Sequence, residues 1–145
     1  MADYCTLDDV SPLNSAIGEL SDETQLTEAG AGTLITQVSA ELDGRLRAKG
    51  YAIPVTDTEA LATLKAYCMS GSAARILRSL FPAATGVGGD GGAAAAHEKA
   101  YADGLALIDR GGLAADMVLS GGCNVADGFP RHHHHHHHYD DGRRY

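Results

Sequence analysis

The sequence predicts an all-α protein, a small helical bundle of about four helices with a long extended C-terminal tail. Two long segments, about 27–49 and 58–81, repeat apolar residues at helical spacing. A glycine or a proline follows each of these patterns, as at the end of a helix. Residues 120–145 hold too few apolar side chains to build a core. We therefore expect a helical domain over residues 1–119 and an extended tail over 120–145.

The first helix is predicted to be short. Thr6 is a good N-cap, and Asp9 three residues later completes a capping-box pattern. Pro12 limits this helix to a turn or two, because proline lacks the backbone donor that a helix interior needs.

The second helix is predicted from about Thr27 to Lys49. Basic residues gather near its end, where they complement the helix dipole, and Gly50 stands where a terminating glycine belongs. Its apolar face is expected to consist of Leu34, Ile35, Val38, Leu42 and Leu46.

A corner is predicted between the second and third helices, in the stretch "GYAIPV". Ile53 precedes Pro54, which favours extended backbone. Tyr51 and Pro54 are rigid, amphipathic residues suited to contact another subunit, so Tyr51, Ile53 and Pro54 form a candidate inter-subunit corner. The alternative for Tyr51 is that it fixes the corner to its own core.

The third helix is predicted over about 58–81, capped by Asp57 or Thr58. Gly71 lies in its middle, where glycine costs about 1 kcal/mol, so we expect a close crossing with the second helix there. Its buried side is predicted to consist of Leu61, Leu64, Cys68, Ile76, Leu77 and Leu80.

A glycine-rich stretch over 83–92 is predicted to be a flexible connector, because it matches neither a P-loop nor a dinucleotide-binding turn. A fourth helix is expected over 93–112, closed by Gly111 and Gly112.

The formal net charge of -8 argues against a nucleic-acid binder, whose affinity comes mainly from lysine and arginine. It is compatible with a protein that surrounds DNA without gripping it, because an acidic wall repels the duplex. The sequence shows no signal peptide and no apolar run of about 20 residues. We therefore expect that the protein is made in the cytoplasm and that it does not contact a membrane.

No catalytic constellation is evident, so we expect no enzyme activity and no cofactor. His97 is the only histidine outside the tail, and the three cysteines show no CxxC spacing. A histidine run in the tail is either native sequence or a purification tag, and the residues that follow it without a linker favour native sequence. Adventitious metal binding is expected of its alternate members, without a specific site: His132, His134, His136 and His138.

The order of several short patterns resembles the head–tail connector (adaptor) proteins of tailed bacteriophages. The chain has an opening tyrosine and "TLDDV", then a helix with "LDGRL", then "GYAIP". The resemblance spans residues 4–81 and does not extend to the glycine-rich stretch or the histidine run.

This resemblance implies a homo-oligomeric, dodecameric ring below the portal protein in the virion. The ring would extend the DNA channel, with DNA passing through the lumen without sequence-specific binding. It would dock tail, stopper or tail-terminator proteins, and a C-terminal extension would reach the portal or a neighbouring copy. A segment that orders on binding can cover much partner surface.

The tail contains aromatic and arginine residues, which often dominate the binding energy of interfaces. The residues expected to bind the portal or a neighbour are Phe129, Arg131, Tyr139, Arg143, Arg144 and Tyr145. The alternative function is a small helical regulatory or chaperone-like module that binds a protein partner and has a metal-binding, histidine-rich tail.

Overall fold

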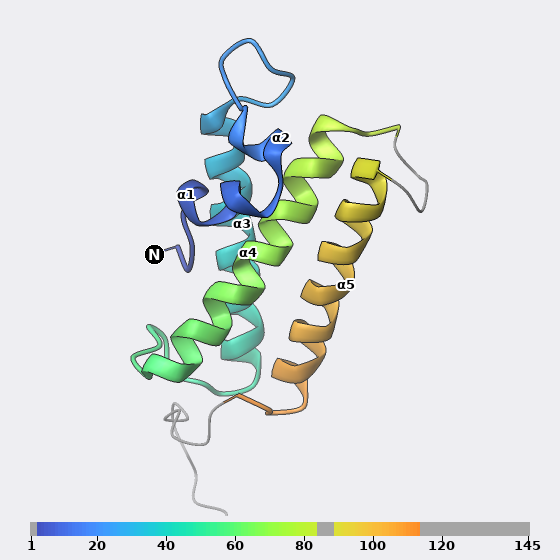
Figure 1. The fold of residues 1–145 in the computed structure, drawn as a ribbon. Helices are drawn as coiled ribbons and strands as arrows, with labels where there is room; N and C mark the ends of the chain where they lie inside the picture. The colour runs from blue at the N-terminus through green and yellow to red at the C-terminus, as the bar shows by residue number, and fades with distance from the viewer. Residues whose placement is uncertain (1–2, 84–88, 114–145) are drawn as a thin grey trace, which may run out of the picture.

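A computed structural model of the chain describes residues 3–83 and 89–113, which form helices and connecting segments without strands (Figure 1). Three short helices come first and three long helices follow. They are α1 (Leu7–Val10), the 3-10 helix η1 (Ser11–Leu13), α2 (Ser15–Gly18), α3 (Glu28–Ala48), α4 (Thr58–Leu80) and α5 (Gly89–Asp109). The predicted all-α class is confirmed, whereas the boundary at 119/120 and the tail lie outside the described residues.

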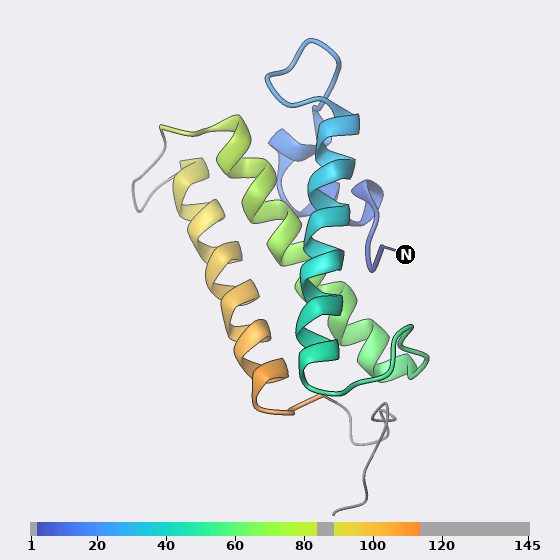
Figure 2. The same cartoon turned by 180° about the vertical axis from the view of Figure 1, so that it is seen from behind.

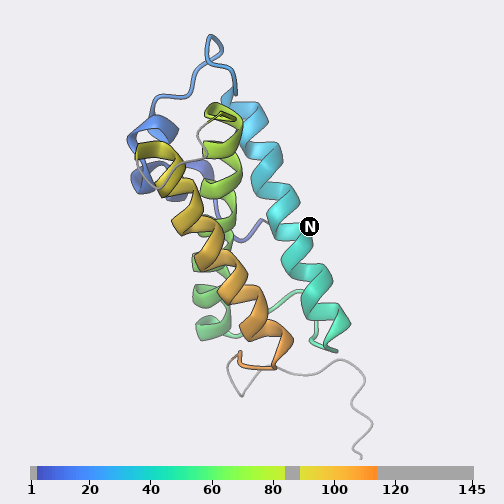
Figure 3. The same ribbon diagram turned by 90° about the vertical axis from the view of Figure 1, so that its right-hand side faces the viewer.

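The helix α4 is the centre of the bundle. It packs against both α3 and α5, runs antiparallel to both, and crosses α3 so that its C-terminal half lies between them (Figures 1 and 2). The short N-terminal helices pack beside α3 and α4, on the side away from the C-terminal half of α5 (Figure 3). The corner between α3 and α4 and the end of α5 therefore lie at the same end of the molecule (Figure 1).

The predicted helix ends are confirmed by local hydrogen bonds and backbone angles. The side chains of Thr6, Thr27 and Asp57 each accept a hydrogen bond from a backbone N–H in the first turn of the next helix. Asp9 completes the capping box of α1. Gly50 has a φ of 82°, in the left-handed region that ends a helix and that other residues rarely adopt.

The structure differs from the prediction in the start of one helix and in the presence of one additional short helix. The helix α5 begins at Gly89, inside the stretch expected to be a connector, and its Ala94 packs into the core. The short helix α2 was not predicted, although Asn14 caps it by accepting a hydrogen bond from the backbone of Ala16.

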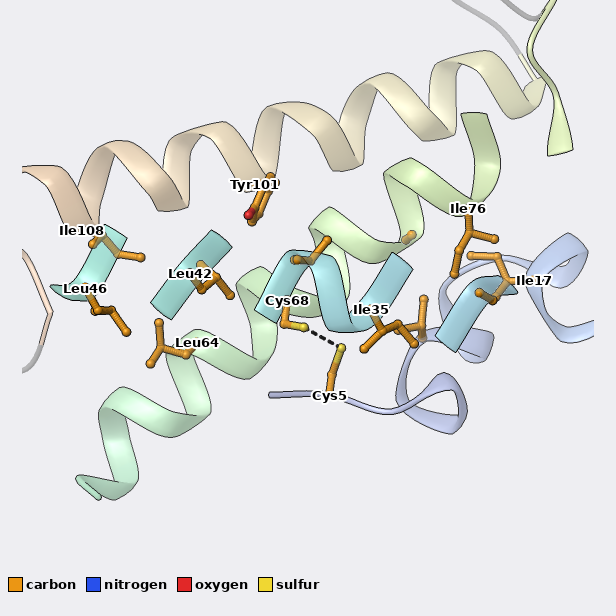
Figure 4. Close-up of a cluster of buried hydrophobic side chains, with 14 of the residues drawn as sticks. Cys5, Ile17, Ile35, Leu42, Leu46, Leu64, Cys68, Ile76, Tyr101 and Ile108 are labelled. Atoms are coloured by element: carbon orange, nitrogen blue, oxygen red, sulfur yellow. Dashed lines mark hydrogen bonds between the residues drawn. The ribbon is translucent and has the colours of Figure 1, made fainter. Parts of the chain in front are cut away.

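The core consists mainly of aliphatic side chains from the five α-helices of the described residues, lying along α4 (Figure 4). The largest fully buried hydrophobic side chains are Ile17, Leu42, Leu46, Leu64, Ile76, Leu77 and Ile108. One predicted core residue is wrong, because Leu61 is 37% exposed. It lies in the first turn of α4.

The contact between α4 and α5 is built from two glycine–tyrosine pairs. A Cβ atom on Gly71 of α4 would lie 2.9 Å from the ring of Tyr101 of α5. In the reciprocal pair, a Cβ atom on Gly104 of α5 would lie 2.6 Å from the ring of Tyr67 of α4. Gly71 does mark a close helix–helix contact, but the prediction that the second helix forms this contact is wrong. The ring that occupies the space beside Gly71 belongs to Tyr101 of α5.

Candidate binding site at the corner

A pocket of about 800 Å³ opens beside the corner between α3 and α4. We call it the corner pocket. The N-terminal segment, the last turns of α3, the corner and the first turns of α4 each form part of its wall. It is lined by Asp3, Tyr4, Asp43, Arg47, Ile53, Pro54, Val55, Leu61, Ala62 and Lys65. Most of these side chains are apolar or present apolar stems, which is typical of binding pockets.

The three residues of the predicted inter-subunit corner lie in different environments. Tyr51 is 7% exposed and belongs to the chain's own core cluster, as the alternative for this residue stated. Ile53 is half-buried and Pro54 is exposed, and both line the corner pocket. Contact of the corner with another subunit stays a prediction, and its accessible residues are Ile53 and Pro54.

Tyr4 joins the N-terminal segment to α3. Its hydroxyl donates a hydrogen bond to Asp43 Oδ1 at 2.5 Å, and its backbone N–H donates to Ser39 Oγ at 3.1 Å. Burial, together with this bond to a carboxylate, raises the pKa of Tyr4. Asp43 is only 3% exposed, so the tyrosine compensates an acid that would be costly to bury without a partner.

A buried polar cluster holds the same segment to α4. The thiol of Cys5 donates to Cys68 Sγ at 2.9 Å, and Ser39 Oγ lies 3.4 Å from the same sulfur (Figure 4). The hydrogen bond between the cysteines raises the pKa of Cys5 and lowers that of Cys68. Cys5 and Cys68 are both buried and their thiols are free, which confirms the burial predicted for Cys68. The third, Cys123, lies outside the described residues.

Charged residues surround the apolar floor of the pocket. Lys65 pairs with Asp9 of α1 at 2.7 Å, and this pairing is the main cause that lowers the pKa of Asp9 to about 2. Asp3 accepts a hydrogen bond from Thr36 Oγ1. Arg47 is exposed and forms no ion pair with another described residue. The rim therefore offers one accessible positive charge for a ligand.

The corner pocket, which combines apolar and charged side chains, is suited to binding a ligand or a protein segment. Within the described part of the chain, no three histidine, cysteine or acidic side chains gather as a metal site would require. His97 lies on α5 and does not line the corner pocket. No helix among the described residues combines the length and the apolar character needed to cross a bilayer.

The predicted tail residues from Phe129 to Tyr145, including the histidine run, lie outside the described residues. Sequence reasoning missed the roles of Asp43, Leu61 and Lys65 in the pocket. For Asp43 a signal was present, because it follows Ile35 and Ser39 at spacings of four and therefore lies on the inward face of α3.

Comparisons with known proteins add no family assignment. No protein-family model, no curated protein and no solved structure matches this chain.

Proposed function

We propose that this chain is a head–tail connector (adaptor) of a tailed phage. In this role its copies form a dodecameric ring below the portal protein, at the head–tail interface of the virion. The ring extends the DNA channel and presents a platform to the tail or to stopper and tail-terminator proteins.

One observation carries the proposal. Of the three short patterns that resemble connectors, the opening pattern is more than 30 residues from the other two, and residues of all three line the corner pocket. Tyr4 of the opening pattern hydrogen-bonds Asp43 of "LDGRL", and both residues line the pocket beside Pro54 of "GYAIP". Residues that form one contact depend on one another for their packing. This dependence supports the interpretation of the three patterns as a single signature.

The surface properties agree with a structural role. Ile53, Pro54 and Leu61 leave an accessible apolar surface at one end of the bundle, suited to a protein contact. The net charge of -8 suits a conduit that does not hold DNA. The tail offers aromatic and arginine side chains to the portal or to a neighbouring copy, Phe129 and Arg131 first among them.

The experiment is to purify tailed particles from cells that express either the full chain or a chain ending at Gly128. We expect the full chain to co-purify with particles and to appear as a ring below the portal by cryo-electron microscopy. The shortened chain should keep its helical circular dichroism and should fail to join particles. A second variant with serines in place of His132–His138 controls for the histidine run and should still assemble.

Two results would contradict the proposal. If the full chain is absent from particles and stays a monomer or dimer, the regulatory or chaperone-like module is the better interpretation. If the chain ending at Gly128 still yields tailed, infectious virions, the tail is not the anchor.

A further inference from the structure

The corner between α3 and α4 lies near the point where the described chain stops. After α5, residues 110–113 turn beneath the bundle toward the corner (Figures 1 and 2). Leu113 is 6% exposed and belongs to the same core cluster as Tyr51 and Val55, of which Val55 also lines the pocket. A Cβ atom on Gly111 would lie 3.8 Å from the hydroxyl of Tyr51. The segment that follows Leu113 therefore starts near the corner between α3 and α4.

The sequence of that segment matches the pocket. Residues 116–119 read Asp-Met-Val-Leu, an acid followed by three large apolar side chains. The pocket has the same two components, an apolar floor that leaves Leu61 37% exposed and a rim that carries Arg47. Residues 116–119 are the third to sixth residues after Leu113, and an extended segment of this length reaches about 10–20 Å.

We propose that residues 116–119 of the same chain fill the corner pocket. Met117, Val118 and Leu119 cover the exposed side chains of the corner and of α4, and Asp116 pairs with Arg47. Docking within one chain is favoured because a short connection gives an effective concentration in the millimolar range. This inference concerns the isolated protein and does not depend on the proposed connector function.

A tryptophan reporter tests the proposal, because the chain has no Trp of its own. In the full chain carrying Leu119→Trp, we expect blue-shifted emission and weak quenching by acrylamide, a neutral quencher that the charge substitutions below do not attract or repel. Met117→Trp serves as a second reporter, and circular dichroism shows that each variant is folded.

A matched pair of substitutions then locates the indole. Leu61 and Leu13 are the large hydrophobic residues that the described chain exposes most, at 37% and 38%. Leu61→Asp, in the pocket, should shift the emission to the red and increase acrylamide quenching. Leu13→Asp, outside the pocket, should leave both unchanged.

The ionic contact is tested by exchange of charges. Arg47→Glu should increase quenching of the reporter, and adding Asp116→Lys should reverse that increase. The shielding should be the same at all protein concentrations.

Three outcomes would overturn the proposal. They are solvent-like emission from both reporters, shielding that Leu61→Asp does not change, and shielding that is lost on dilution. The last result would assign the pocket to a second copy of the chain. All these measurements use the isolated protein, so their failure is separate from a failure to find the chain in virions.

Discussion

Replacing Gly71 by alanine tests the packing of α4 against α5. The added Cβ atom would lie 2.9 Å from Cδ2 and Cε2 of Tyr101, whereas carbon atoms in favourable contact are about 3.5–4.0 Å apart. The ring of Tyr101 is only 9% exposed, so it cannot move away without disturbing the core (Figure 4). The helices must therefore separate or the ring must leave its rotamer.

The magnitude follows from two opposed effects. Overpacking of a core typically costs about 1–3 kcal/mol, and replacing a helical glycine by alanine contributes about 1 kcal/mol of stability. The net expectation for Gly71→Ala is a loss of roughly 0–2 kcal/mol in the free energy of unfolding. Gly71→Leu places a larger side chain in the same space and should cost about 1–3 kcal/mol.

Gly44 is the matched control, because it lies within α3 and a Cβ atom there would meet nothing within 4 Å. Gly44→Ala should stabilise the protein by up to about 1 kcal/mol. The assay is urea unfolding followed by far-ultraviolet circular dichroism, with all variants compared in one buffer. If Gly71→Ala stabilises as much as Gly44→Ala, or Gly71→Leu keeps full stability, the close approach of Tyr101 to Gly71 is wrong.

Three further predictions concern the cap, the acid and the buried hydroxyl. Thr6→Ala should lower the free energy of unfolding by about 0.5–2 kcal/mol, because it removes the cap of α1, and urea unfolding measures this loss. The pKa of Asp9 is lowered to about 2 in the folded protein, so its stabilisation is present above about pH 4 and is lost as the pH falls toward 2. Unfolding between pH 2 and 5 should therefore depend less on pH in Asp9→Asn, and equal slopes would contradict this. Tyr101→Phe should leave stability unchanged or raise it, because the hydroxyl of Tyr101 is buried without a hydrogen-bond partner among the described residues. A large decrease in the melting temperature of this variant would show that the hydroxyl is hydrogen-bonded.

The features that the sequence predicted well are local. A capping box needs only Thr6 and Asp9, and a helix end needs only a glycine such as Gly50 that can adopt a positive φ. Helical periodicity over 27–49 and 58–81 likewise depends on residues a few positions apart. The helix class and most helix ends could therefore be predicted from short windows of sequence.

The candidate site could be predicted only in part. The stretch "GYAIPV" was identified as a corner, and Ile53 and Pro54 do line a pocket there. Its remaining walls come from the N-terminal segment, α3 and α4, and their meeting depends on Tyr4 reaching Asp43. Those two residues are 39 positions apart, so no local pattern indicates the pair.

By itself, the sequence determined which face of each helix is apolar and where most helices end, because these properties depend on side-chain type and spacing along the chain. The tertiary structure decided which surface covers each apolar face. It placed Tyr101 over Gly71, brought Tyr51 into the core and left Leu61 exposed at the pocket. The physical reason is that periodicity identifies a face to be buried, while the partner of that face depends on how whole helices pack together.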